Sequence, residues 1–380
     1  MSEPTVIPYG RHAIDQDDIT AVLDVLRSDW LTSGPTVGAF EQELARRCAA
    51  AAAVSCANGT AALHLSCLAL GLGPDDTAIV PAITFVATAN AVSHTGAIPH
   101  FVDSTWDTLG LDAAALDAHL AEISGRRDGE LVNRQTGRRL RAVVPVHIFG
   151  HPVDMAPLLE VAAKYGIAVV EDATESLGST WKGQACGTFG HSAVLSFNGN
   201  KIVTTGGGGM ILTDDDEYAI RARHITTTAK KSHAWSFDHD EIGYNYRLPN
   251  INAALGCGQM ESLPAFVAAK RELAARYLEI FGNFPGARIY REPEGARSNY
   301  WLNTLVLDPE NAGERDRLLS ALHANGVHAR PLWMPMHLLP MYRECPRSRL
   351  PVAEDMHARC INLPSSPFLA AGERSTATES

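Results

Sequence analysis

Short apolar runs alternate along the chain with longer segments whose apolar residues recur at helical spacing. Three runs are apolar or rich in β-branched residues and are bounded by Gly or polar residues, at 142–148, 167–170 and 193–195. Runs of this length and composition are typical of buried strands. Residues 154–165 carry Pro157 in their first turn and predict a helix between two of the strands. This β-α-β order, repeated between residues 53 and 194, indicates a mostly parallel sheet with helices on both faces.

Two of the predicted strands end in loops that carry a carboxylate and an amine. One strand is followed by Glu171-Asp172, and the next is followed by Ser196-Phe197 and the loop Asn-Gly-Asn-Lys201. Because ligands of open α/β sheets bind at strand ends, we expect Asp172 and Lys201 to share one cleft. For either residue taken alone, a paired or solvated surface charge is the alternative.

The loop around Lys201 is poor in apolar side chains and is followed by glycines at 206–209. Such a run lets the backbone approach a ligand closely, at a cost in conformational entropy. Lysine forms Schiff bases with carbonyl compounds, pyridoxal phosphate (PLP) among them. That cofactor also requires an acidic group against its pyridine nitrogen, and Asp172 can supply it. The residues around Lys201 therefore favour a PLP site.

A second junction between a strand and a helix offers a candidate phosphate site. A short apolar run at 53–57 leads into a predicted helix through Asn58-Gly59-Thr60. A helix N-terminus presents free backbone N–H groups, and with a hydroxyl beside them it suits a phosphate. An ordinary helix cap is the alternative, since Asn and Thr are common in that role.

The stretch 169–213 resembles the DegT/DnrJ/EryC1/StrS family of PLP-dependent sugar aminotransferases, and the resemblance covers nearly the whole chain. The family pattern is an Asp three residues before Gln or Glu, then Ser-Phe, then the cofactor lysine; here these are Asp172, Glu175, Ser196-Phe197 and Lys201. The resemblance implies an α/β protein of PLP-dependent transferase fold type I, like aspartate aminotransferase. We expect a three-layer αβα large domain with a mostly parallel sheet, plus a smaller α/β C-terminal domain.

We place the domain boundary where a predicted helix that begins at Pro264 leads toward Pro285-Gly286. Residues 1–262 would then form the large PLP-binding domain with an N-terminal helical segment. Residues 263–380 would form the small C-terminal domain.

The resemblance also implies a role for each site residue. Lys201 is the expected catalytic residue, Asp172 pairs with the pyridine nitrogen, and Phe85 stacks on the cofactor ring. Glu175 would lie near the phenolic oxygen, where the family commonly has Gln, and a carboxylate there is repelled by a phenolate unless one of them is protonated. The expected cofactor-phosphate contacts are Gly59, Thr60, Ser196, Asn198 and the partner subunit's Asn245.

The spelling SFNGNKIVTTGGGG resembles the subgroup that acts on UDP-linked 4-keto-6-deoxy-N-acetylhexosamines. It implies amino transfer from L-glutamate to C4 of UDP-2-acetamido-2,6-dideoxy-4-keto-hexose, giving a UDP-4-amino-4,6-dideoxy-N-acetylhexosamine for surface polysaccharide biosynthesis. A GDP-perosamine-type or dTDP-keto-sugar aminotransferase, or a non-catalytic regulatory protein on the same fold, stays an alternative. Because family members place the Asn of the GYNYR segment in the neighbouring site, we expect a homodimer with a shared active site.

The composition limits the classes of partner that the protein can bind and the compartment in which we expect it. The net charge is −11 and no basic block exceeds a pair, so the protein lacks the basic surface that binding to nucleic acid or to an anionic membrane requires. Seven cysteines are scattered without metal-ligand spacing, which fits free thiols in a reducing compartment and no metal site. No apolar stretch approaches the length of a membrane span or a secretion signal. We therefore expect a cytoplasmic protein.

Overall fold

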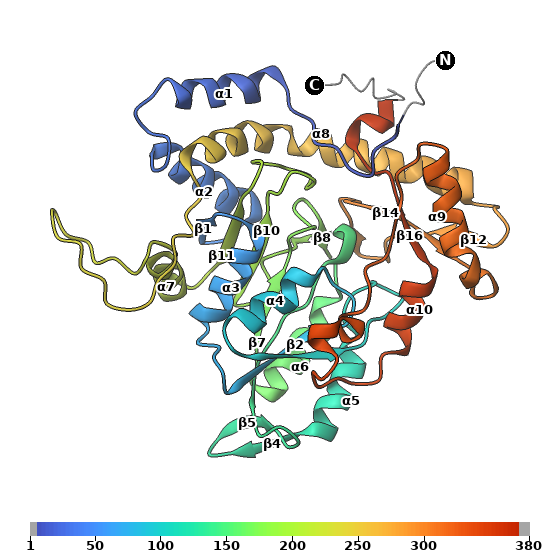
Figure 1. Ribbon diagram of the computed structural model, residues 1–380, viewed down its shortest axis with the longest axis horizontal. Helices are drawn as coiled ribbons and strands as arrows, with labels where there is room; N and C mark the ends of the chain where they lie inside the picture. Colours follow the sequence, from blue (N-terminus) through green and yellow to red (C-terminus); the bar gives the residue numbers. More distant parts are fainter. Residues whose placement is uncertain (1–5, 372–380) are drawn as a thin grey trace.

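A mixed sheet forms the centre of the molecule in the computed structural model, which describes residues 6–371 (Figure 1). Its strands are β1 (Ala52–Cys56), β2 (Asp76–Pro81), β3 (Ile98–Val102), β4 (Ser124–Arg127), β5 (Glu130–Asn133), β6 (Arg139–Val143), β7 (Ala168–Asp172), β10 (Ser192–Ser196) and β11 (Gly209–Thr213). The order is β1-β11-β10-β7-β6-β2-β3, and the β4–β5 hairpin joins β6. Strands β3, β2, β6, β7 and β10 are parallel, whereas β11 runs antiparallel to both of its neighbours. The predicted mostly parallel sheet is confirmed.

Helices cover both faces of this sheet and give it three layers. They are α2 (Pro35–Cys48), α3 (Gly59–Ala69), α4 (Val86–His94), α5 (Ala113–Ile123), α6 (Met155–Tyr165), α7 (Asp216–Thr226) and α8 (Asn250–Phe281), and α1 (Gln16–Leu26) packs on α8. Side chains alternate between the faces, as the pleat requires. In β7, Val169 packs with α5 and α6, while its neighbour Val170 packs with α3 and α4. Within residues 6–371, none of the helices has the length and apolar character needed to cross a membrane.

A smaller antiparallel sheet follows in the C-terminal part of the chain. Its strands are β12 (Ala287–Ile289), β14 (Asn303–Leu307), β16 (Cys360–Leu363) and β15 (Arg330–Pro331), in that spatial order. Helices α9 (Arg315–Ala324) and α10 (Pro351–Arg359) accompany it. Three short strands form a separate sheet, β8 (Thr180–Trp181), β9 (Gln184–Ala185) and β13 (Ala296–Arg297). The remaining elements are 3₁₀ turns, η1 (Ile148–Gly150), η2 (Pro309–Glu314), η3 (Met336–Leu338), η4 (Pro340–Tyr342) and η5 (Pro367–Ala371).

Helix α8 begins well before the predicted start at Pro264 and contains that proline in its interior. Proline lacks the N–H that would bond to the carbonyl four residues earlier, which is why the sequence pattern suggests a helix start there. The helix continues because Met260, Leu263 and Val267 are buried on both sides of the proline against the large sheet layer. Tertiary packing outweighs the lost hydrogen bond. The helix thus crosses residue 262, where we placed the domain boundary, and the boundary itself stays a prediction.

Two segments without regular structure frame the rest. Residues 6–13, which we call the N-terminal strap, run beside the small sheet: Ile7 pairs with Val327, and the Tyr9 carbonyl accepts the N–H of Ser365. Residues 227–249, which we call the projecting loop, connect α7 to α8, and the middle of this loop extends away from the body of the molecule (Figure 1). Its C-terminal part returns to the body, where Tyr246 and Leu248 pack against the core. The strap reaches the candidate site, whereas the tip of the projecting loop points away from it.

Candidate active site

One cavity of ≈ 320 Å³ is lined by all the predicted site residues except one. It lies where β7 and β10 end, as expected for an open α/β sheet. The predicted residues that line it are Gly59, Thr60, Phe85, Asp172, Glu175, Ser196, Asn198 and Lys201. Asn245 is exposed on the projecting loop and does not line the cavity of its own chain.

Asp172 is the last residue of β7, and its buried carboxylate is held at both oxygens. The Thr88 hydroxyl donates to Oδ2 at 2.7 Å, and the Thr174 N–H donates to Oδ1 at 3.2 Å. The Thr88 hydroxyl also lies 2.7 Å from that of Thr84, so a short chain of hydroxyls supports it. The carboxylate is therefore fixed in direction before any ligand arrives.

Lys201 and Glu175 meet at the centre of the cavity. Lys201 Nζ lies 3.3 Å from Glu175 Oε1 and 3.9 Å from the centre of the Trp301 ring. Glu175 Oε2 accepts the backbone N–H of Phe149 at 2.8 Å, and Phe149 has a φ of 57°, a left-handed value rare for a bulky side chain. Burial raises the pKa of Glu175 to about 7, although the nearby Lys201 opposes the rise. Near neutral pH this carboxyl therefore exists in both protonation states, so it can be neutral beside a phenolate.

The N-terminus of α3 forms a cradle for an anion. Asn58 caps the helix by accepting the N–H of Ala61 at 2.8 Å, whereas the N–H groups of Gly59 and Thr60 lie in the first turn, where a helix offers no acceptor. These groups and the helix dipole favour negative charge. A Cβ on Gly59 would lie 2.9 Å from Cβ of Ser196, closer than real Cβ atoms approach. Glycine is therefore needed for α3 to lie this close to the end of β10.

Phe85 stands at the cap of α4 with 53% of its surface exposed, because its ring borders the cavity. The Trp333 ring lies 6.1 Å from it, centre to centre. The cavity therefore combines an anion cradle, a fixed carboxylate, an amine and an aromatic face. These are the groups that PLP requires, so the residues present fit that cofactor.

Sequence reasoning missed four residues of the site: Thr88, Tyr9, Trp301 and Trp333. Thr88 has a signal, because it lies one helical turn after Phe85 and can face the same cleft. The other three come from the N-terminal strap and from the C-terminal part of the chain, and no pattern among their sequence neighbours points to this cavity. Only the tertiary fold brings them to Lys201.

Comparison with known proteins identifies the family of the chain. The chain matches the DegT/DnrJ/EryC1/StrS aminotransferase family over residues 12–378. It is 35% identical to a GDP-perosamine synthase of Caulobacter vibrioides, over 96% of this chain and 94% of that protein. Among solved structures it resembles PseC of Helicobacter pylori, described as an aminotransferase involved in the biosynthesis of pseudoaminic acid, with 26% identity and a TM-score of 0.86 over 94% of this chain and 93% of the other.

The fold is also shared with Spr1654 of Streptococcus pneumoniae, for which PLP and PMP forms have been solved. The PLP form has 25% identity and a TM-score of 0.85, covering 95% of this chain and 93% of that chain. The PMP form has 26% identity and the same TM-score, covering 94% of both chains. The match across the family and the fit of the cavity agree, and the chain belongs to the DegT/DnrJ/EryC1/StrS family as a PLP-dependent sugar aminotransferase.

Proposed function

We propose that this enzyme transfers the amino group of L-glutamate to C4 of UDP-2-acetamido-2,6-dideoxy-4-keto-hexose, giving a UDP-4-amino-4,6-dideoxy-N-acetylhexosamine for surface polysaccharide biosynthesis. The observation that carries the amino-transfer chemistry is the meeting of Lys201, Asp172 and the α3 N-terminus in one cavity. The N-acetylhexosamine rests on the sequence of the Lys201 loop, and the similarity to PseC, described as an aminotransferase of pseudoaminic acid biosynthesis, supports amino transfer to a sugar.

The residues of the cavity divide the work by their chemistry. PLP, when bound, supplies a carbonyl carbon that carries the amino group and a ring that accepts electron density. Asp172, oriented by Thr88, would hold the ring nitrogen, while the expected phosphate contacts are Gly59, Thr60, Ser196, Asn198 and the partner subunit's Asn245. Phe85 would cover one face of the ring.

Proton movement falls to Lys201, whose amine would bind the cofactor covalently and then carry protons at Nζ. Glu175 Oε1 lies 3.3 Å from that nitrogen, near enough to share a proton with it. Because the pKa of Glu175 is about 7, the carboxyl can accept or return a proton near neutral pH. We assign Glu175 the role of accepting and returning a proton beside the phenolic oxygen of the cofactor.

The nucleotide is the open part of the proposal. A GDP-linked sugar is the second candidate, because relatives named GDP-perosamine synthase share 35% identity over nearly the whole chain. Incubation of the purified enzyme with L-glutamate and matched UDP-, GDP- and dTDP-linked 4-keto-6-deoxy sugars tests it, with the product read by mass spectrometry and NMR. We expect turnover of the UDP-linked N-acetyl sugar. Turnover of the GDP sugar alone would transfer the assignment to the second candidate.

A homodimer would complete the site. The projecting loop exposes Trp235 by 81%, Phe237 by 76% and Ile242 by 84%, which is unusual for side chains of this size in water. Asn245 follows on the same loop and is itself exposed. A second copy packed against the loop would cover these side chains and bring the partner subunit's Asn245 to the phosphate cradle. The seven unpaired cysteines support a reducing, cytoplasmic location.

A further inference from the structure

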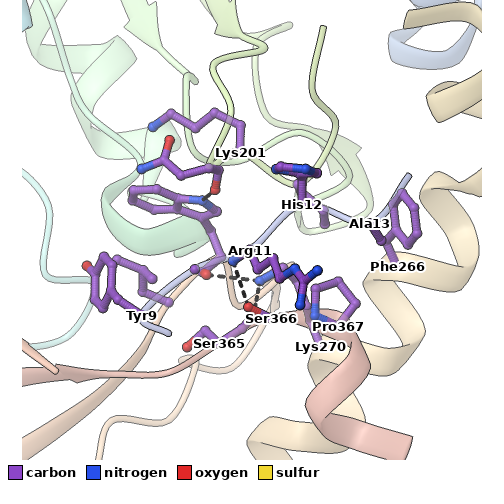
Figure 2. A pocket seen from close by; sticks show the side chains of 15 residues that line it. Tyr9, Arg11, His12, Ala13, Lys201, Phe266, Lys270, Ser365, Ser366 and Pro367 are labelled. Carbon is purple, nitrogen blue, oxygen red and sulfur yellow. Dashed lines mark hydrogen bonds between the residues drawn. The ribbon is translucent and has the colours of Figure 1, made fainter. Parts of the chain in front are cut away.

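A second, much smaller cavity of ≈ 20 Å³ lies beside the catalytic one, and Lys201 borders both. Its walls come from the N-terminal strap, the Lys201 loop, α8 and residues 365–367. Figure 2 shows the side chains of Tyr9, Lys201 and Lys270 around it, each carried by a different segment. The first two also line the catalytic cavity, whereas Lys270 does not and has no role in the chemistry described above.

Lys270 is buried in the middle of α8 with only 4% of its surface exposed. Its Nζ donates to the carbonyl oxygen of Trp301 at 3.1 Å and to that of Ser365 (Figure 2). Within residues 6–371, no carboxylate lies within ion-pair distance of this nitrogen. Burial lowers its pKa to about 7. A neutral amine retains two N–H donors, so it satisfies both carbonyls without a counter-ion.

The contact with Trp301 leads to the catalytic lysine. Lys270 holds the main chain of Trp301, whose ring lies 3.9 Å from Lys201 Nζ. The indole Nε1 also donates to the carbonyl of Asn200 at 2.8 Å, one residue before Lys201. Trp301 therefore contacts both the amine and the loop that carries it. A displacement of the Trp301 main chain would therefore move the ring that contacts Lys201 Nζ and the loop that carries this lysine.

The contact with Ser365 leads to the N-terminal strap. The Ser365 N–H donates to the Tyr9 carbonyl at 3.2 Å, and Ser366 Oγ accepts the N–H of Arg11 at 2.8 Å. The charged or titratable groups that share the cavity with Lys270 are Tyr9, Arg11, His12 and Lys201, and none of them is a carboxylate. The Lys270 amine thus connects α8 to two segments that line the catalytic cavity: directly to Trp301, and through Ser365 to Tyr9 of the strap.

We propose that Lys270 is a positioning residue for Lys201, acting through the main chain of Trp301 and the indole ring that borders the catalytic amine. The proposal rests on the role assigned to Lys201 under the proposed function. Buried hydrogen bonds to two carbonyls from distant parts of the chain are the means by which a scaffold holds a reactive group in place.

The test measures how fast Lys201 of the cofactor-free enzyme captures added PLP, by borohydride trapping and quantification of the Lys201 peptide. Lys270→Met keeps the length of the side chain and removes its donors. We expect capture to slow by about 10- to 100-fold, since small misplacements of a reacting group have effects of this size. Near-ultraviolet circular dichroism of the cofactor-free variant should change as well, because Trp301 loses its anchor. No sugar is present, so an error in the proposed substrate leaves the test intact.

Arg359→Met is the matched control. Arg359 is a buried cation that donates to the Leu307 carbonyl and pairs with Asp355, but it lines neither cavity. We expect it to capture PLP within about twofold of the wild-type rate, because distant sites act independently. Equal rates for Lys270→Met and wild type, or equal slowing in both variants, would overturn the proposal. If Lys270→Met is insoluble, Lys270→Gln is the second variant: its amide nitrogen lies one bond nearer the main chain than the amine of Lys270, so it cannot hold both carbonyls as the lysine does. We then expect slower capture and a changed dichroism spectrum, and wild-type capture with an unchanged spectrum would overturn the proposal.

Discussion

Glu175→Gln should change how the stability of this enzyme depends on pH. Glu175 is buried, and one of its oxygens accepts the N–H of Phe149. Glutamine has nearly the same shape and keeps an acceptor for that N–H, but it cannot titrate. The variant therefore isolates the effect of the carboxyl proton, with Lys201 still present on the other side.

The sign follows from the direction of the shift. Burial raises the pKa of Glu175 from 4.5 to about 7, so between these values the folded protein holds a proton that the unfolded chain has released. This contribution to stability is fully present below pH 4.5 and is lost as the pH rises through 7. The limiting size is about 3 kcal/mol, of which about 2.5 kcal/mol falls between pH 5 and pH 8. Glutamine should therefore become more favourable than glutamate, by about that amount, as the pH rises.

The assay is urea unfolding of the cofactor-free protein at pH 5, 6, 7 and 8, followed by tryptophan fluorescence and circular dichroism. The difference in unfolding free energy between variant and wild type is the quantity to plot. Glu43→Gln is the control: Arg46 and Arg47 lower the pKa of Glu43 to about 2, so its effect should be flat across this range. A flat or falling difference for Glu175→Gln would refute the reasoning, because it would mean that Glu175 stays ionised throughout.

Two further predictions concern the cofactor cradle and the dimer. Gly59→Ala should weaken PLP binding by about tenfold or more, because the added Cβ meets Ser196; equilibrium dialysis measures it, and Gly73→Ala, where a Cβ meets nothing within 4 Å, should bind normally. Lys201→Ala and Asn245→Asp proteins should each be inactive, yet refolding them together should restore about a quarter of wild-type activity, since half of the dimers then carry one intact site. No recovery would contradict a shared site.

The sequence was informative where chemistry leaves a local signature. Asp172 and Lys201 could be placed in one cleft because strand ends on an open α/β sheet converge, and Gly59 could be placed because a strand-to-helix turn is visible in the pattern. Trp301 and Tyr9 could not be placed, because their positions depend on contacts such as those of Lys270 with two distant carbonyls. Local pattern says nothing about such pairings.

The start of α8 is a second case in which the local sequence pattern does not predict the structure. A proline is a local signal for a helix boundary, yet burial of Met260 and Val267 on either side of Pro264 carries the helix through it. The two classes of error share one cause, which is that side-chain packing between distant segments outweighs local preference.

The most direct test of the whole account is borohydride reduction of the PLP-loaded enzyme, before and after L-glutamate, followed by mass spectrometry of the Lys201 peptide. We predict that Lys201 carries the reduced cofactor in the absence of glutamate, that glutamate removes most of this label, and that Lys201→Ala gains no label there. A peptide without label, or a label indifferent to glutamate, would contradict the assignment of Lys201 as the residue that carries the cofactor through amino transfer.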